Sequence, residues 1–585
     1  MEIPKERLEK MLDKYVAETF GESFTFREQQ KEVVLDIVAA FFDATCNLYL
    51  LDAPTGSGKS LIAMIVGGFL TQYKVKGYIL ASDLALQTQY EKDFRKFNLQ
   101  WGSIKGVDNY MCIVNSERFS LGECRLKNTS YEEAETLPCF PDCGYLFSRK
   151  LSIKSPVSLL NYSYWLIQRN YVEGKMQDRG KGVPFPKRDF TLCDEAHKVP
   201  EIVQNHFSPR VDERTVEKME KLRSVLQKNN LTTPRATSTR LRAVVRNMFK
   251  ENDQEKIYAL LKEFEIHLAE FVKAGASIKE YVASRFPKEV EVPKEWRINM
   301  GMVDWVKDMH CKFEDYNHII SQVGIDSMVK NPQGEQLMFH CIDESYMMER
   351  HFHSQAGFKL LMTATMGEPA TFLKTIGAKN ARYFRMDSTF NFEKSPIYFY
   401  PKRRMSKAQK DKTLPWVIDK VDEIMNLHPE ESGIIHSGSY EISGKIYESL
   451  PPDQKKRVLV YQGTQEKEEA LQRFLSEKNL ILMGPSILEG LDLASEKSRF
   501  QVFVKVPFPS IGDKFVSAKM NYQPDWYDWR TITSILQGVG RSVRSEEDWA
   551  ITYFLDGCLV DLLKRRRSSF PPEIQRRIKV VNEDI

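Results

Sequence analysis

Residues 48–60, LYLLDAPTGSGKS, place a short apolar run, a glycine-rich loop and the start of a helix in direct succession. The apolar run 48–51 predicts a buried strand, and 53–60 fits the Walker A pattern of phosphate-binding loops. Glycines let the backbone N–H groups of such a loop curl around phosphate, and the following helix points its positive end at the same charge. We therefore expect a strand, a phosphate loop and a helix from Lys59 to about Tyr73.

The loop supplies most of the expected nucleotide contacts. Lys59 is expected to reach the β- and γ-phosphates of ATP, and the Ser60 hydroxyl to ligate Mg²⁺. Upstream, the Arg27-x-x-Gln30 spacing would place both side chains on one helical face beside the nucleotide base. A chance turn of glycine and serine is the alternative interpretation, which the flanking strand and helix disfavour. The expected ATP-binding residues of this region are Arg27, Gln30, Ala53, Pro54, Thr55, Gly56, Ser57, Gly58, Lys59 and Ser60.

A second polar motif ends another apolar run, 189–194 (DFTLCD). This run predicts a buried strand whose carboxyl end carries Asp194-Glu195-Ala196-His197, and open α/β sheets bind ligands at the carboxyl ends of their strands. Asp194 is suited to hold Mg²⁺ through water, and Glu195 to position and deprotonate an attacking water. An acidic helix cap is the alternative interpretation. Together with the phosphate loop, the motif predicts an ATP-hydrolysing site.

The composition is that of an ordinary globular protein, with 585 residues, 42% of them hydrophobic and 28% charged. This length suggests about four domains. The charged start, MEIPKERLEK, does not fit a signal peptide, and the longest apolar run, 61–70, is too short to cross a membrane. We therefore expect a cytoplasmic protein, or a nuclear one in a eukaryote, with no membrane partner. The net charge of +4 is small, so any basic surface must be local.

Four of the nine cysteines, Cys112, Cys124, Cys139 and Cys143, lie in one irregular stretch at 101–150. In a reducing compartment such a cluster indicates metal binding before disulfide formation. Four thiolates bind either zinc or an iron–sulfur cluster, and the spacing alone does not separate the two. The other five cysteines are interpreted as isolated or buried side chains.

The alternation of strands and helices that is typical of a doubly wound sheet stops in the irregular stretch 101–150, and it is interrupted a second time between His197 and the next buried run, 358–362. Roughly 160 residues separate them, whereas one βαβ step needs on the order of 30. Apolar residues at three- and four-residue intervals predict a mainly helical insertion, with helices at 214–227, 238–250 and 253–286. Its basic residues would contact a phosphate backbone, or only cover a solvated helical bundle. These residues are Arg240, Arg242, Arg246 and Lys250.

A new α/β pattern occupies the chain from about residue 395 and predicts a second sheet. It contains no second phosphate loop, which is expected if a single ATP binds in a cleft between two lobes. Aromatic residues within it, Trp526, Tyr527 and Trp529, would stack nucleic-acid bases or pack in the core. The expected strands are 396–400, 433–436, 458–461, 480–483, 501–506 and 550–555.

Residues 534–544 (SILQGVGRSVR) contain Gln537-x-x-Gly540-Arg541-x-x-Arg544, which resembles motif VI of superfamily 2 helicases. The resemblance implies that Arg541 and Arg544 act as arginine fingers on the γ-phosphate. Residues 363–365 (TAT) and 489–492 (EGLD) resemble motifs III and V, and all the motifs occur in the family's order. The resemblance adds Glu489, Gly490 and Asp492 to the ATP-binding set and implies a catalytic set of Lys59, Asp194, Glu195, Gln537, Arg541 and Arg544.

The cysteine region is similar to one branch of this superfamily. Residues 109–112 (NYMC) look like the opening of the iron–sulfur insertion of the XPD/DinG (Rad3-related) helicases, and 161–162 (NY) and 505–509 (KVPFP) are also similar to that family. In the family, a four-cysteine domain precedes motif II, the DEAH motif that resembles residues 194–197 here, and a helical arch follows it. These are the two positions at which the strand–helix alternation of this chain is interrupted. The resemblance favours a 4Fe–4S cluster, with zinc as the lesser alternative.

The resemblance implies an α/β fold with two RecA-like, doubly wound lobes. The implied division is lobe 1 at 1–105, 151–205 and 351–390, an iron–sulfur insertion at 106–150, a helical arch at 206–350 and lobe 2 at 391–585. The implied function is an ATP-dependent DNA helicase that moves 5′ to 3′ on single-stranded DNA and unwinds forked duplexes. A translocase that does not unwind, an RNA-directed enzyme and a non-hydrolysing nucleotide switch are the alternatives.

Overall fold

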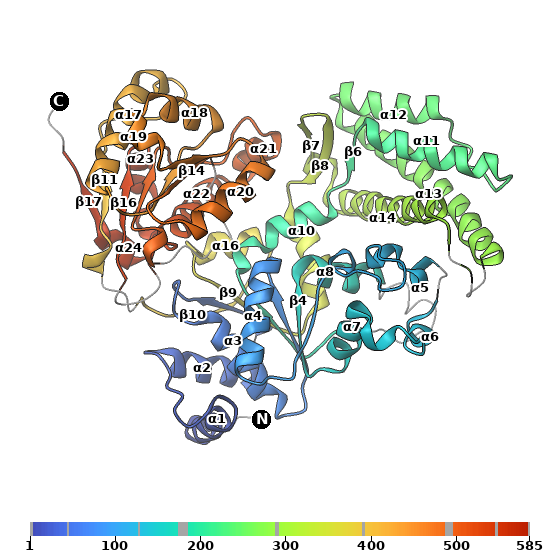
Figure 1. Cartoon of the computed structure of the whole chain (residues 1–585), viewed down its shortest axis with the longest axis horizontal. Helices are drawn as coiled ribbons and strands as arrows, with labels where there is room; N and C mark the ends of the chain where they lie inside the picture. Colours follow the sequence, from blue (N-terminus) through green and yellow to red (C-terminus); the bar gives the residue numbers. More distant parts are fainter. Residues whose placement is uncertain are drawn as a thin grey trace.

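This computed structural model describes residues 4–43, 46–126, 129–172, 185–286, 290, 292–388, 392–485, 495–543 and 548–582. Two parallel-sheet lobes and a long helical projection form the molecule (Figure 1). Lobe 1 lies at the bottom of this view, lobe 2 at the upper left and the helical projection at the upper right. The predicted α/β class with two sheet lobes is confirmed. No helix in the described ranges is both long and apolar enough to cross a membrane.

Lobe 1 is built on a seven-stranded sheet in the order β10-β1-β9-β5-β2-β4-β3, with every neighbouring pair parallel. Its strands are β1 (Leu48–Asp52), β2 (Gly77–Ala81), β3 (Gly102–Ile104), β4 (Val157–Asn161), β5 (Phe190–Cys193), β9 (Phe358–Thr363) and β10 (Arg382–Arg385). Its helices are α1 (Lys5–Phe20), α2 (Gln30–Asp43), α3 (Lys59–Thr71), α4 (Leu84–Lys96), α8 (Tyr162–Ile167), α10 (Val199–Phe207), α15 (Glu344–His351) and α16 (Pro369–Thr375).

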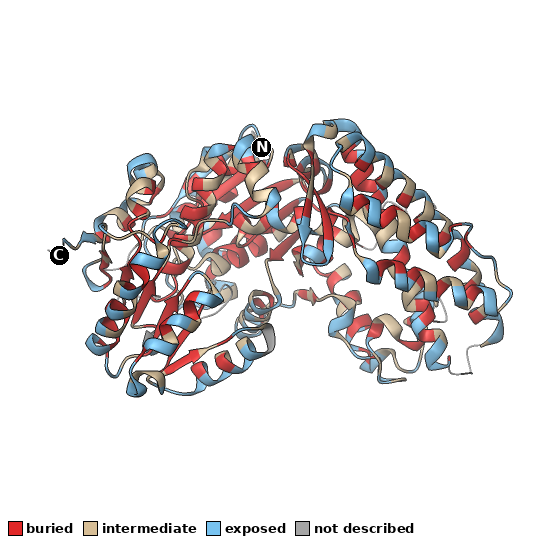
Figure 2. Cartoon of the chain, turned by 90° about the horizontal axis from the view of Figure 1, so that it is seen from above, coloured by how far each residue is buried: buried red, intermediate tan, exposed pale blue. Residues whose placement is uncertain are grey.

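The central strands of this sheet are buried on both faces, because helices cover both sides of it (Figure 2). In β1, Leu48 and Leu50 face one hydrophobic core, and Tyr49 and Leu51 face the other. A strand with two buried faces needs an unbroken apolar run, which is the pattern at 48–51. The neighbouring strands β1, β9 and β5 are parallel and end at the same edge of the sheet. At this edge they lead into the phosphate loop, the 363–365 motif and the 194–197 motif, respectively.

Lobe 2 repeats this architecture with the strand order β13-β14-β12-β15-β16-β11-β17, again all parallel. Its strands are β11 (Ile397–Phe399), β12 (Gly433–His436), β13 (Val458–Val460), β14 (Ile481–Gly484), β15 (Phe500–Phe503), β16 (Ile551–Phe554) and β17 (Ile578–Val580). Its helices are α17 (Lys410–Leu427), α18 (Tyr440–Ser449), α19 (Pro452–Lys455), α20 (Thr464–Ser476), α21 (Lys514–Tyr522), α22 (Pro524–Val539), α23 (Leu559–Arg566) and α24 (Pro572–Arg577).

The helical projection, named the arch, consists of α11 (Glu213–Lys228), α12 (Ser238–Lys250), α13 (Gln254–Arg285) and α14 (Lys294–Val323). The three predicted helices are confirmed, whereas α14 was not predicted. A three-stranded antiparallel sheet, also not predicted, joins the arch to lobe 1, and we name this junction the arch root. Its strands are β6 (Arg210–Val211), β7 (Met328–Gln333) and β8 (Gln336–Cys341).

The four-cysteine stretch forms short helices beside the arch: α5 (Glu123–Leu126), α6 (Tyr131–Ala134) and the longer α7 (Gly144–Lys154). The Tyr145 ring lies 4.3 Å from that of Phe119 and 5.5 Å from that of Tyr110, between centroids. The Arg149 guanidinium lies 3.4 Å from the ring centroid of Tyr131. The stretch is therefore organised by a few aromatic contacts and has no sheet of its own in the part that the structure describes.

Candidate functional site

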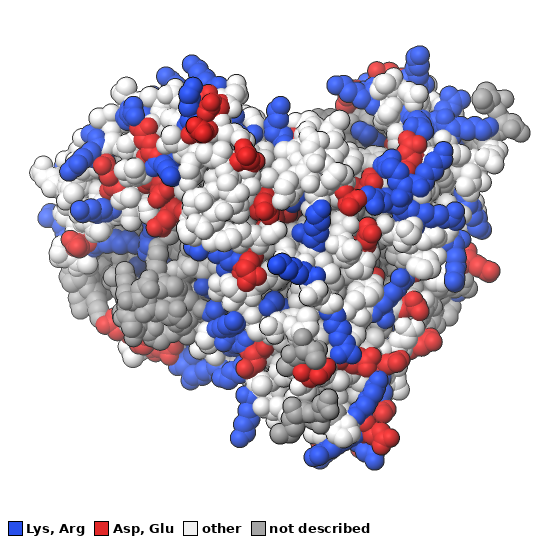
Figure 3. Space-filling model, turned by 180° about the vertical axis from the view of Figure 1, so that it is seen from behind, with Lys and Arg blue, Asp and Glu red and all other residues white. Residues whose placement is uncertain are grey.

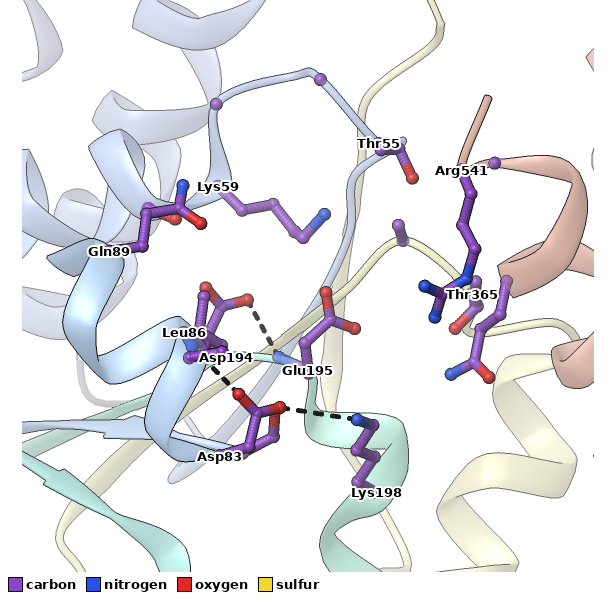
Figure 4. Close-up of a pocket in the computed structure, with 18 of the residues that line it drawn as sticks. Thr55, Lys59, Asp83, Leu86, Gln89, Asp194, Glu195, Lys198, Thr365 and Arg541 are labelled. Carbon is purple, nitrogen blue, oxygen red and sulfur yellow. Dashed lines mark hydrogen bonds and ion pairs between the residues drawn. The ribbon is translucent and has the colours of Figure 1, made fainter. Parts of the chain in front are cut away.

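A cavity of about 470 Å³ lies between the lobes, at the carboxyl ends of β1, β5 and β9 (Figure 4). Both lobes line it, although lobe 1 supplies most of the residues. The predicted residues that line it are Arg27, Thr55, Gly56, Gly58, Lys59, Ser60, Asp194, Glu195, Gln537 and Arg541. Gln30, Ala53, Pro54 and Ser57 are not among the lining residues.

The phosphate loop depends on glycine at two positions. Gly56 and Gly58 have φ values of 81° and 82°, in the left-handed region that other residues enter only at a cost. A Cβ atom on Gly58 would also lie 2.3 Å from Nε2 of Gln30. The loop can therefore keep this curve above Gln30 only with glycine at position 58.

Arg27 and Gln30 support the loop from the side of α2. Gln30 is 1% exposed and donates from Nε2 to the Ser57 carbonyl at 2.6 Å, while Arg27 donates from Nη1 to the Gly56 carbonyl. The prediction that both side chains lie beside a base stays a prediction. Gln30 is held under the loop because its amide satisfies a loop carbonyl, and only Arg27 borders the cavity.

Asp194 is a buried carboxylate at the floor of the cavity. Tyr90 donates its hydroxyl to Oδ2 at 2.8 Å, and the Glu195 backbone N–H donates to Oδ1 at 2.9 Å. Burial, followed by the neighbouring Glu195 carboxylate, raises the Asp194 pKa to about 6, although Lys59 and the Tyr90 hydroxyl oppose the shift. A buried carboxylate beside a serine hydroxyl fits the oxygen ligands that Mg²⁺ prefers. Asp194 and Ser60 are therefore suited to hold this ion.

Glu195 has an unusual backbone. Its φ of 50° and ψ of 44° place it in the left-handed region, which costs a non-glycine residue about 1–2 kcal/mol. Its side chain remains 32% exposed, and in Figure 4 it points into the cavity. The strained turn thus directs one carboxylate into the cavity, while its neighbour Asp194 stays buried below.

His197 connects three motifs, a role that the sequence did not assign. Its Nδ1 lies 2.9 Å from the Thr363 hydroxyl and 3.3 Å from both the Thr365 hydroxyl and Oε2 of Glu195. Its Nε2 contacts the side-chain amide of Gln537, on lobe 2. The imidazole therefore bridges the two lobes beside Glu195.

Arg541 follows α22 and is 9% exposed, with its side chain directed into the cavity (Figure 4). The preceding residue, Gly540, is in close contact with the phosphate loop. A Cβ atom there would lie 3.0 Å from both the Thr55 hydroxyl and the Leu536 carbonyl. Glycine at position 540 therefore lets lobe 2 approach the loop closely enough for Arg541 to enter the site.

Four predicted site residues lie outside the described residues, namely Arg544 and the motif V residues Glu489, Gly490 and Asp492. Their predicted roles stay predictions.

The four predicted metal-binding cysteines are free thiols, and Cys112 and Cys143 are buried. Burial, followed by the charges of Cys112 and Cys143, raises the pKa of Cys124 to about 11, and burial followed by Cys143 raises that of Cys139. Thiols that influence one another in this way lie near each other. No three described His, Cys, Asp or Glu side chains form a group that could hold a metal ion as they stand. The donor set fits zinc or iron chemically, and binding would have to draw the thiolates together.

Another cavity of about 470 Å³ lies at the arch root, between the segment after α10, the start of α11 and the middle of α14. Its walls carry Arg210, Arg214 and Lys218, and the Lys218 ammonium lies 4.8 Å from the ring centroid of Trp305. Lys312 also lines it and pairs with Asp308 at 3.3 Å. A cationic cavity with an aromatic wall suits a phosphate and a base together.

The lobe-2 aromatic residues pack in the core, as their alternative interpretation held. Trp526 is 8% and Trp529 4% exposed, and Tyr527 donates its hydroxyl to the Pro509 carbonyl at 3.1 Å. In the arch, Arg240 pairs with Glu263, and Arg242 with Glu220 at 2.8 Å.

Seen from behind, Lys and Arg gather most densely over lobe 2, at the upper right of Figure 3. The basic surface is therefore local, as the small net charge predicts.

Two parallel-sheet lobes that enclose one phosphate-binding cavity define the class of two-lobed, RecA-like ATPases. Residues 23–231 match the family described as type III restriction enzyme, res subunit, and residues 421–577 match the helicase C-terminal domain family.

Individual proteins agree with these matches. The chain is 19% identical over 460 residues to the ATP-dependent DNA helicase YoaA of Haemophilus influenzae, across 72% of this chain and 67% of that protein. The structure of S. tokodaii Xpd4 shares the fold with a TM-score of 0.58 at 15% identity, over 95% of this chain and 100% of that chain. An XPD helicase structure gives 0.61 at 14% identity, over 95% and 99%. With the motif order, these findings support an XPD/DinG-type superfamily 2 helicase.

Proposed function

We propose that this chain is an ATP-dependent DNA helicase that moves along single-stranded DNA by opening and closing the cleft between its lobes. The observation that carries the proposal is the shared cavity, in which Lys59 and Glu195 of lobe 1 face Arg541 of lobe 2. Such a site is complete only when the lobes are together. ATP binding and hydrolysis would therefore change the distance between them.

The residues divide the chemistry in a definite way. Lys59 and the loop N–H groups would hold the β- and γ-phosphates, and Ser60 and Asp194 would hold Mg²⁺, which would offset phosphate charge. Glu195 orients the attacking water and accepts its proton. Arg541 stabilises the negative charge that develops on the γ-phosphate. The contact between His197 and Gln537 crosses the cleft. Through it, loss of the γ-phosphate changes the position of one lobe relative to the other.

We propose that the cavity at the arch root holds one nucleotide of the strand, with its base against Trp305. Trp305→Ala is expected to weaken single-stranded DNA binding by about 1–3 kcal/mol, the usual contribution of one base–aromatic stack. Fluorescence anisotropy with an oligo-dT strand at fixed salt would measure the change, with Trp305→Phe expected to restore binding. Trp416→Ala, on α17 of lobe 2, is the matched control. Equal affinities for the two alanine variants would exclude a contact at Trp305.

The direction of movement is a separate prediction. We expect movement from 5′ to 3′, because the XPD/DinG resemblance implies it, although the residues themselves do not fix polarity. A strand-displacement assay with 5′-tailed, 3′-tailed and forked duplexes of DNA and of RNA measures direction and substrate together. Unwinding of only the 3′-tailed DNA duplex would contradict the direction. ATP hydrolysis without displacement on any duplex would indicate a translocase, and displacement of RNA alone an RNA helicase.

We propose further that Cys112, Cys124, Cys139 and Cys143 bind one 4Fe–4S cluster. The support is the donor set, its gathering in one stretch, and the position of that stretch beside the arch (Figure 1). Zinc remains the lesser alternative, because it accepts the same four thiolates.

A further inference from the structure

Helix α22 divides its apolar residues between the two halves of the molecule. Trp526 and Trp529, in its first turns, belong to the core shared by lobe 1 and the arch. Ile532, Leu536 and Val539, further along, belong to the core of lobe 2. The same helix then delivers Gln537 and Arg541 to the nucleotide cavity. One rigid element of 16 residues therefore spans from the lobe-1 surface to the arginine of the site.

The start of this element is fixed on lobe 1 by polar and apolar contacts. Trp529 donates from Nε1 to the Met366 carbonyl at 2.8 Å, and its ring stacks on Phe372 with centroids 5.9 Å apart. A Cβ atom on Gly367, whose φ is 65°, would lie 3.2 Å from the Trp529 ring. Met366 directly follows the Thr363–Thr365 motif, so the anchor of α22 adjoins the site that its other end completes.

Helix α21, which precedes α22, is fixed on the arch root. Its cap residue, Asp513, accepts two hydrogen bonds from Nδ2 of Asn331 on β7, at 3.2 and 3.1 Å. Lys519 donates from Nζ to Oε2 of Glu344 and to the Ile342 carbonyl, both at 3.0 Å. The side chains of Lys519 and Glu344 are only 2% and 7% exposed. A buried ion pair thus joins lobe 2 to α15 of lobe 1, close after the last arch-root strand β8.

A buried pair of this kind holds one geometry, because separating the partners leaves a desolvated charge without its counterion. Lobe 2 can therefore rotate readily about α21 and the start of α22, but it cannot readily separate from lobe 1 there. Movement about a fixed end swings the far end of α22, where Arg541 lies, toward or away from the phosphate loop.

We propose that α21 and the first turns of α22 are the fulcrum of lobe 2, and that Lys519 is a positioning residue that places Arg541 in the nucleotide site. The inference rests on the proposed ATPase function. It also means that the arch root and the nucleotide cavity share one mechanical element, so that displacement of the arch by a duplex is transmitted to Arg541.

The test is the steady-state ATPase activity of Lys519→Met in the full-length protein with saturating single-stranded DNA. Misplacing a catalytic group from a distance costs up to about 100-fold, so we expect kcat to fall roughly 10- to 100-fold while KM for ATP changes less than about threefold. Lys519→Arg keeps the charge and is expected to recover most of the activity. Lys420→Met is the matched control, because this buried lysine pairs with Glu423 inside lobe 2, at 2.6 Å.

A double-mutant cycle separates positioning from general destabilisation. In an Arg541→Ala background, Lys519→Met is expected to cause no further loss of single-turnover hydrolysis, because the residue it positions is already absent. An equal loss in both backgrounds, or wild-type kcat in Lys519→Met, would overturn the inference. Absence of DNA-stimulated hydrolysis in the wild-type protein would instead overturn the proposed function, so the two failures are distinct.

Discussion

Glu195→Gln is expected to reduce DNA-stimulated ATP hydrolysis by roughly 10²- to 10⁴-fold, the range that one general base contributes. The amide keeps the size of the side chain but cannot accept the proton of the attacking water. Because Glu195 is directed into the cavity by its own strained backbone, no neighbouring carboxylate takes its place; Asp194 is 2% exposed and lies below. Phosphate release in the presence of single-stranded DNA measures the loss.

Lys59→Ala is expected to cause a comparable loss for a different reason, since it removes the charge that holds the phosphates. Binding of a fluorescent ATP analogue distinguishes the two, because Glu195→Gln should still bind nucleotide and Lys59→Ala should bind it weakly. Glu448→Gln, an exposed position on α18, is the matched control. Hydrolysis within a few-fold of wild type in either site variant would remove its assigned role.

Cys112→Ser is expected to abolish duplex unwinding while leaving ATP binding nearly normal. The cysteine stretch has two helices of four residues, the longer α7 and a few aromatic contacts, so ligation of the proposed cluster would supply much of its folding free energy. The phosphate loop, by contrast, stands on an independent seven-stranded sheet. Anaerobically purified wild type is expected to be brown, with broad absorption near roughly 400 nm and about four irons per chain. Iron analysis and strand displacement on the same preparation measure both effects.

Cys311→Ser is the control for this variant, because Cys311 is a buried cysteine of α14 in the arch, outside the four-cysteine stretch. Its iron content should equal that of wild type. Colourless wild-type protein with one zinc per chain would contradict the iron–sulfur assignment, which rests on the family resemblance.

The sequence predicted the central strands of both sheets well, because strands buried on two faces require unbroken apolar runs. Of the four edge strands, β13 was predicted, whereas β3, β10 and β17 were missed. In β10, RYFR, only Phe384 is buried, and β3 is the short GSI, so neither has such a run. The antiparallel strands β7 and β8 were hidden inside an insertion whose helical periodicity dominated its interpretation. Strands of this kind form because a neighbouring strand is available for hydrogen bonding. The sequence of the strand itself does not show that neighbour.

For the site, contiguous motifs gave the residues but not their partners. Lys59, Glu195 and Arg541 were predicted from short patterns, and all three line one cavity. The hydrogen bond from Gln30 to the Ser57 carbonyl was not predicted, because it depends on how α2 packs against the loop. Lys519 carried no signal, since its partner Glu344 is 175 positions away in the sequence. Contacts that cross between domains depend on the assembled fold and leave no local trace.

The position of the arch between two neighbouring strands also constrains how the protein is made. β5 and β9 are hydrogen-bonded side by side, with Leu192 opposite Leu360, yet the whole arch is synthesised between them. A ribosome must therefore translate the arch before lobe 1 receives the strand that joins β1 to β5. Until then, the apolar faces of β1, β2 and β5 form an unfinished sheet with exposed edges, the type of intermediate that aggregates. Nascent chains paused within the arch should depend most on chaperones.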